Sequence, residues 1–130
     1  MKVAIMAEQN FNLIDGSTIW LLNVCKLMAS VPGFDVSLLL SHPLTERVLA
    51  DEVPATVRIT DAAELLLAAG MAGPRIEPAQ LARVLRNHEA ASGPFDRIFV
   101  RGDAYLEALL RDSAFGHRLV GYAPGLLPDL

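Results

Sequence analysis

The sequence contains one cysteine, one tryptophan and two tyrosines among its 130 residues. A single cysteine cannot form an internal disulfide, and it excludes a metal site built from several thiolates. Basic side chains are also few, because eleven lysines and arginines against fifteen aspartates and glutamates give a net charge of −4. A balance of this sign does not favour nucleic acid or an anionic membrane as a partner. We therefore expect no nucleic-acid partner and a reducing, cytoplasmic location.

Long hydrophobic runs are missing as well. No uninterrupted apolar stretch approaches the roughly 20 residues that span a membrane. Residues 19–28 come nearest, but Asn23 and Lys26 interrupt them. The apolar run at residues 3–7 is too short for the core of a signal peptide. Hydrophobic residues nevertheless make up 52% of the chain, which is enough to fill the core of one domain over residues 1–130.

Short apolar runs alternate with helical patterns along the whole chain. Strands are predicted at residues 3–7, 35–40, 56–60, 97–100 and 118–122, and helices at 18–30, 61–69, 78–91 and 103–113, with a short helical turn at 45–49. Such alternation produces a parallel sheet, and right-handed crossovers place helices on both of its faces. The sequence therefore predicts an open, doubly wound, Rossmann-like α/β domain with strand order 3-2-1-4-5. A closed barrel is excluded because it needs eight strands.

The predicted fifth strand is followed by a short apolar segment, residues 123–130, which contains two prolines and no predicted helix. Without a closing helix the last strand is partly uncovered. This pattern predicts either a piece of a larger protein or an interface, for example a homo-oligomer that forms through the exposed sheet edge.

Ligands of open α/β sheets bind beyond the carboxyl ends of the strands. The loops at that edge are residues 7–17, 41–45, 101–103 and 123–127. The first loop runs through Asp15, Gly16 and Ser17 directly into a helix, whose free N–H groups and positive dipole end form an anion site. Alternatively, Asp15 or Ser17 only caps the helix, and Gly16 only permits the turn. Neither a dinucleotide fingerprint nor a P-loop is present.

Other polar residues follow the same strands. Arg101 is placed to reach a carboxylate or a phosphate, and Asp103 is expected to cap the next helix. Glu8 ends the first strand, and His42 either contacts a ligand or is a solvated loop residue. Cys25 lies among apolar residues in mid-helix, which indicates a small buried side chain rather than a nucleophile. No histidine pair, carboxylate pair or Ser/His/Asp set has a convincing spacing, so no catalytic residue, metal site or cofactor is predicted.

Four segments together suggest a known family: residues 2–5, the turn 15–17 with the aliphatic helix 19–27, the strand 95–102, and the strand and loop 120–126. They resemble the N-terminal half of a GT-B-fold glycosyltransferase of the large retaining, nucleotide-sugar-dependent family (glycosyltransferase family 4-like). That family often has two glycines in the first turn, where this chain begins with Asp15. It often has a histidine in the fifth-strand loop, where this chain has Tyr122 and the two residues after it.

The resemblance implies that the chain is the acceptor-side domain of an enzyme that moves a sugar from a nucleotide-sugar donor to a sugar-containing acceptor. In that family the C-terminal domain binds the nucleotide sugar and carries the paired glutamates. The implied partner is therefore that missing domain, and the chain alone is expected to be inactive. Ligand contacts are expected at Asp15, Gly16, Ser17, Arg101 and Tyr122.

Two other functions remain open. The first is a self-standing flavodoxin-like domain that binds a small ligand or a protein without catalysis. A receiver-type domain is disfavoured within that class, because Glu8 stands alone after the first strand and no lysine follows the fifth. The second is a non-catalytic assembly domain that uses its exposed edge.

Overall fold

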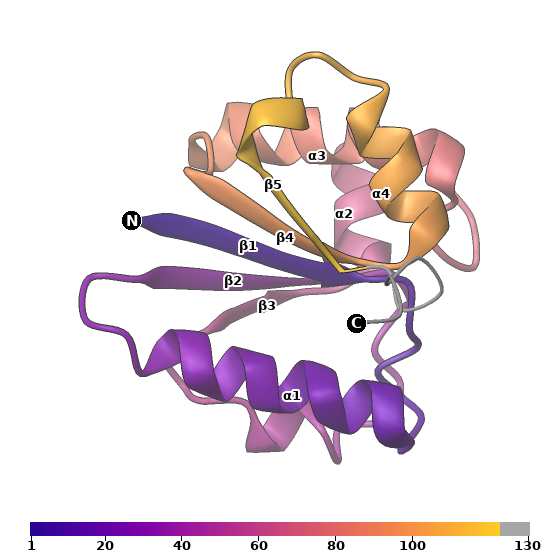
Figure 1. Ribbon diagram of the computed structural model, residues 1–130. Coiled ribbons are helices and arrows are strands. Elements are labelled where there is room, and N and C mark those ends of the chain that lie inside the picture. Colours follow the sequence, from indigo (N-terminus) through magenta and orange to yellow (C-terminus); the bar gives the residue numbers. More distant parts are fainter. Residues whose placement is uncertain (123–130) are drawn as a thin grey trace, which may run out of the picture.

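The computed structural model describes residues 1–122, the last of them by its backbone only. Five strands form one parallel sheet in the order β3-β2-β1-β4-β5, which confirms the predicted topology. The strands are β1 (Lys2–Ala7), β2 (Asp35–Leu40), β3 (Arg58–Thr60), β4 (Arg97–Arg101) and β5 (Leu119–Tyr122) (Figure 1). The helices are α1 (Gly16–Ala29), α2 (Ala62–Ala68), α3 (Pro78–Ser92) and α4 (Asp103–Leu110), with 3-10 turns η1 (Ala50–Glu52) and η2 (Gly116–Arg118).

The helices are divided unevenly between the two faces of the sheet. Figure 1 shows α1 on one face and α2, α3 and α4 on the other. Right-handed crossovers account for this division, because the chain moves outward from β1 to β3 and then reverses direction to reach β4. The reversal makes the gap between β1 and β4 the topological switch point, where open sheets bind their ligands.

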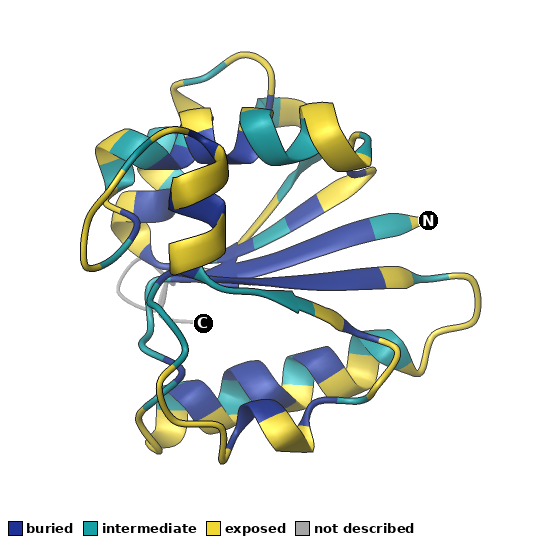
Figure 2. Ribbon diagram, turned by 180° about the vertical axis from the view of Figure 1, so that it is seen from behind, coloured by how far each residue is buried: buried dark blue, intermediate teal, exposed yellow. Residues whose placement is uncertain are grey.

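The central strand β1 is buried on both faces. Ile5 and Ala7 face the core under α1, whereas Ala4 and Met6 face the core under α2, α3 and α4. This two-sided burial explains the continuous apolar run in the sequence. Figure 2 shows buried residues along the strands and on the inward sides of the helices. Among residues 1–122, no helix combines the length and the apolar character that crossing a bilayer requires.

The predicted short helical turn at residues 45–49 is wrong, and the turn η1 forms just after it. Asn12 explains the difference, because its Oδ1 accepts hydrogen bonds from the backbone N–H groups of Thr45 (2.7 Å) and Glu46 (2.9 Å). These backbone donors are held by the loop that follows β1. The third strand is also shorter than predicted, because Val57 donates its N–H to Pro54 in a turn (2.9 Å).

Candidate functional site

The loops after β1 and β4 are held together at the switch point. The backbone N–H of Glu8 donates to the carbonyl of Arg101 (3.1 Å), which continues the strand pairing beyond the end of β1. Arg101 in turn donates from Nη1 to the backbone carbonyl of Ser17 in the first turn of α1 (3.2 Å). The structure thus brings together Arg101 and the 15–17 turn, two parts of the predicted site that are 84 residues apart.

Asp15 is the N-cap of α1. Its Oδ1 accepts from the backbone N–H of Thr18 (2.9 Å), and its own N–H donates to Thr18 Oγ1 (2.9 Å). This reciprocal pair is a capping box, and it fixes the direction in which α1 leaves the loop. Asp15 therefore performs the capping role that the sequence left as an alternative. Oδ2 of the same carboxylate accepts no hydrogen bond within residues 1–122.

Gly16 and Ser17 present the first backbone N–H groups of α1. Within residues 1–122 no acceptor meets either group, as expected for the first turn of a helix. A Cβ built on Gly16 would meet no atom within 4 Å, so the approach to this turn is open. The N-terminal end of α1 can therefore receive an anion or a hydroxyl oxygen.

Arg101 lies against α1. Its guanidinium carbon is 4.4 Å from the centroid of the Trp20 ring, and Nη2 is 3.5 Å from Ser17 Oγ. Trp20 packs in turn against Phe99, with ring centroids 6.1 Å apart. Stacking of this kind orients the planar guanidinium and leaves its charge beside the helix end. Arg101 thus adds a fixed positive charge next to the open N–H groups.

Glu8, not Asp103, caps α4, so the prediction for Asp103 is wrong. The carboxylate Oε1 of Glu8 accepts from the backbone N–H of Tyr105 (2.6 Å), while the side chain of Asp103 makes no capping bond. Gly102 takes the N-cap position with φ 121°. The capping carboxylate thus comes from the residue that follows β1, whereas most helices are capped by their own N-cap side chain. The helix α4 ends at Leu110 rather than near residue 113.

His42 is half-buried and bonded to Ser41 rather than solvated, and its contact with a ligand stays a prediction. Its Nδ1 lies 2.8 Å from the hydroxyl of the buried Ser41, which also lies 3.2 Å from the carbonyls of Glu8 and Gln9. Burial lowers the pKa of His42, and the nearby Arg75 lowers it further. The Ser41 hydroxyl therefore ties the loop after β2 to the loop after β1, and the imidazole of His42 bonds to that hydroxyl.

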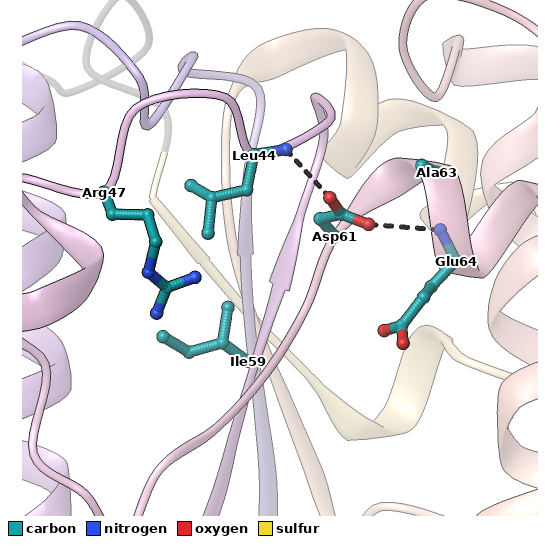
Figure 3. Close-up of a pocket in the computed structure, with 6 residues that line it drawn as sticks. All are labelled: Leu44, Arg47, Ile59, Asp61, Ala63 and Glu64. Carbon is teal, nitrogen blue, oxygen red and sulfur yellow. Dashed lines mark hydrogen bonds between the residues drawn. The ribbon is translucent and has the colours of Figure 1, made fainter.

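A cavity of about 480 Å³ lies at the carboxyl end of β3 (Figure 3). One of its two acids is already engaged, because Asp61 accepts from the backbone N–H groups of Leu44 (2.8 Å) and Glu64 (3.1 Å). Its arginine, Arg47, is paired with Asp51 (3.1 Å). Asp61 and Arg47 thus serve local structure, while the carboxylate of Glu64 has no hydrogen bond within residues 1–122. None of the predicted site residues lines this cavity.

Tyr122 closes β5, and its backbone pairs with that of Arg101. The predicted ligand contact of its side chain, and the loop 123–127, lie outside the described residues. Within residues 1–122, no three histidine, cysteine, aspartate or glutamate side chains gather as metal ligands. At the carboxyl edge the open groups are the N–H donors of Gly16 and Ser17, with the positive charge of Arg101 beside them, and one carboxylate oxygen of Asp15. This arrangement is suited to binding a polar or anionic ligand.

No family model and no curated protein matches the chain. Among solved structures, the chain is similar to UGT2 of Phytolacca americana, whose structure contains UDP-2-fluoro-glucose and pterostilbene. The match has a TM-score of 0.54 and 18% sequence identity, and it covers 93% of this chain but 30% of that one. At this identity the likeness establishes the fold. The chain therefore has the fold of one domain of a GT-B glycosyltransferase.

Proposed function

We propose that this chain is the acceptor-side domain of a GT-B glycosyltransferase, one that transfers a sugar from a nucleotide-sugar donor to a sugar-containing acceptor. The family 4-like, retaining class is the one that its sequence segments resemble. The observation that carries the proposal is the convergence of Gly16, Ser17 and Arg101 at the switch point between β1 and β4. The UDP-sugar analogue in the similar structure supports the same reading.

The proposed contacts follow from the atoms available at that edge. The N–H groups of Gly16 and Ser17 donate to a phosphate or a sugar hydroxyl, and the second oxygen of Asp15 accepts from a hydroxyl. Arg101 contributes charge rather than a new contact, because its guanidinium is already held by Ser17 and Trp20. Tyr122 is proposed as a further contact from the end of β5.

The donor is proposed to bind on a second domain. Sugar transfer needs strong stabilisation of the departing nucleotide phosphate, usually from several cations or a metal ion. At the carboxyl edge of residues 1–122, the arginine beside the open donors is Arg101, which is already engaged. The chain spans 30% of the similar structure, which is consistent with a larger enzyme. We therefore expect no transfer by the chain alone.

The uncovered part of the sheet supports the need for a partner. On the α1 face, a cavity of about 220 Å³ lies over β4 and β5, and its lining is almost wholly apolar: Met1, Val3, Met28, Phe34, Arg97, Phe99 and Val120. Val120 is 42% exposed on this face. Apolar surface of this kind is typical of a contact with another part of a protein. We propose that it packs against the rest of the enzyme.

The test combines binding and turnover. The purified 130-residue chain is mixed with UDP-sugars and a panel of simple glycosides; binding is followed by saturation-transfer NMR and transfer by nucleotide release. We expect weak glycoside binding, with a Kd on the order of millimolar or about 4 kcal/mol of binding free energy, and no release. Turnover by the chain alone contradicts the missing donor domain. Absence of any glycoside binding contradicts the acceptor role.

A further inference from the structure

A second group of polar side chains extends under α3 from Lys2, at the amino-terminal end of β1, to the short strand β3. It borders a cavity of about 150 Å³ on the face covered by α3. The lining residues are donors of hydrogen bonds and come from four elements: Lys2 on β1, Ser37 on β2, Arg58 and Thr60 on β3, and His88 and Ser92 on α3. We call this group the amino-end cluster.

Ser37 lines the cavity from β2. Only 5% of this residue is exposed, yet its hydroxyl meets no hydrogen-bond partner among residues 1–122. The hydroxyls of Thr60 and Ser92 line the same cavity and also lack a partner within residues 1–122. Three hydroxyls thus face one small space.

Arg58 and Lys2 each have N–H groups that make no hydrogen bond within residues 1–122. Arg58 uses Nη2 for both carboxylate oxygens of Asp35 (2.8 and 2.7 Å), which leaves Nε and Nη1 without an acceptor in residues 1–122. Lys2 donates from Nζ to the carbonyls of Ser92 and Gly93, so one of its three N–H groups remains. These carbonyls form the negative end of α3, and the ammonium offsets their repulsion of an anion.

His88 lies between these cations. Its ring stacks on Phe95, with centroids 5.7 Å apart and planes inclined by 10°, and neither ring nitrogen has a hydrogen bond within residues 1–122. Burial lowers the pKa of His88, and Lys2 lowers it further, while Glu89 acts in the opposite direction. An imidazole with cationic neighbours and open nitrogens is well placed to donate to an anion.

A second cavity of about 260 Å³ lies beside the first, and Thr60 and His88 line both. Its other lining residues lie on α2 and α3 and are mostly apolar: Glu64, Leu65, Ala68, Asn87 and Ala91. The pair of cavities therefore has a donor-rich end and an apolar end. A molecule that fills both needs an anionic head and a small apolar body.

We propose that the amino-end cluster binds the phosphate group of a small phosphorylated molecule, whose apolar part lies in the adjoining cavity. A tetrahedral phosphate accepts several hydrogen bonds at once, which matches a site of three hydroxyls, a guanidinium, an ammonium and an imidazole. The site is independent of the proposed function, because it lies under α3 and none of Gly16, Ser17 and Arg101 lines it.

The test uses inorganic phosphate as the probe. Amide and histidine-ring signals of the labelled chain are followed during titration at constant ionic strength, with chloride as the reference. We expect saturable shifts at Ser37, Arg58, Thr60 and His88. Shifts that do not saturate, or that are confined to Gly16 and Ser17, overturn the proposal.

Two variants sharpen the result. Arg58→Gln is expected to weaken phosphate binding at least fivefold. Arg47→Gln is its matched control, because both arginine side chains are similarly exposed (64% and 63%) and each pairs with an aspartate. Ser37→Ala is expected to weaken binding at least threefold without lowering the Tm, because the lost hydroxyl has no partner in the empty site. Equal affinity for Arg58→Gln and Arg47→Gln overturns the proposal.

Discussion

The carboxylate of Glu8 caps a helix that begins 95 residues later in the chain, through a 2.6 Å hydrogen bond from the backbone N–H of Tyr105. The side chain reaches that N–H across Gly102, whose missing Cβ leaves the necessary room. The contact joins the end of β1 to the start of α4 at the switch point of the sheet. It therefore fixes the wall of the candidate site opposite α1.

Gly102→Ala is expected to destabilise the chain by at least about 2 kcal/mol. A Cβ at this position would lie 2.5 Å from the Glu8 carboxyl carbon, and the backbone φ of +121° is one that other residues rarely adopt. Urea denaturation measures the loss. Gly16→Ala is the matched control, because its Cβ meets nothing within 4 Å and its backbone φ is not positive. Equal stability of the two variants contradicts the packing described for Glu8.

Glu8→Gln tests the charge of the cap separately from its shape. An amide oxygen still accepts from Tyr105, but the interaction between a negative charge and the N-terminal end of α4 is lost, at a cost of about 1 kcal/mol. Glu52→Gln, at an exposed position in η1, controls for the change in net charge. Urea denaturation at low salt compares the two. Equal destabilisation by both variants shows that the charge of Glu8 acts nonspecifically.

The ion pair between Glu89 and Arg118 predicts a dependence of stability on pH. Nη1 and Nη2 of Arg118 donate to the two carboxylate oxygens (2.6 and 3.0 Å), and the backbone N–H of Phe95 donates to one of them (2.6 Å). Burial raises the pKa of Glu89, but these hydrogen bonds outweigh it and hold the pKa below its ordinary value of 4.5. Because the pKa is lower in the folded state, the pair stabilises the fold above about pH 4.5, and the contribution disappears as the pH falls through the folded pKa.

Glu89→Gln is therefore expected to cost about 2 kcal/mol at pH 7 and less at pH 3. Denaturation at the two pH values measures the difference. Asp51→Asn, which breaks the exposed pair with Arg47, is expected to change stability by less than about 0.5 kcal/mol at either pH. A cost for Glu89→Gln that does not depend on pH contradicts the assignment.

Cys25 is expected to resist thiol reagents in the folded chain. It is fully buried, and burial raises the pKa of its thiol to about 12, so almost no thiolate exists at pH 8. Reaction with a disulfide reagent should follow the unfolded fraction as urea is added. Rapid reaction of the folded chain at pH 8 would contradict the burial of this part of α1.

The sheet order and the α1 cap could be predicted because their signals are local. The apolar run of β1, the alternation of strands and helices, and Asp15 three residues before Thr18 each lie within one short stretch. The cap of α4 could not be predicted, because Glu8 and Tyr105 are 97 residues apart and Asp103, an acid next to the helix start, was the expected cap. The side chain of Tyr122 lies outside the described residues, so its role stays a prediction.

The amino-end cluster was missed for a similar reason. The sequence has no basic run, and Lys2, Arg58 and His88 stand far apart in the chain. They meet because Lys2 on β1 and Arg58 on β3 lie on the face of the sheet that α3 covers. Only the pairing of the strands in the folded sheet brings them together. Residues that converge from separate elements leave no pattern in the linear sequence.

The most direct test of the proposed acceptor site is a comparison of Gly16→Pro with Gly16→Ala in a glycoside titration followed by backbone amide shifts. Proline is well tolerated at the first position of a helix, and it removes one of the two N–H groups assigned to the ligand, whereas alanine keeps it. The account predicts shifts at Ser17 and in the loops next to Arg101, unchanged affinity for Gly16→Ala, and at least threefold weaker binding for Gly16→Pro. Equal affinity of the two variants, or shifts centred on His117 at the opposite end of the sheet, would contradict it.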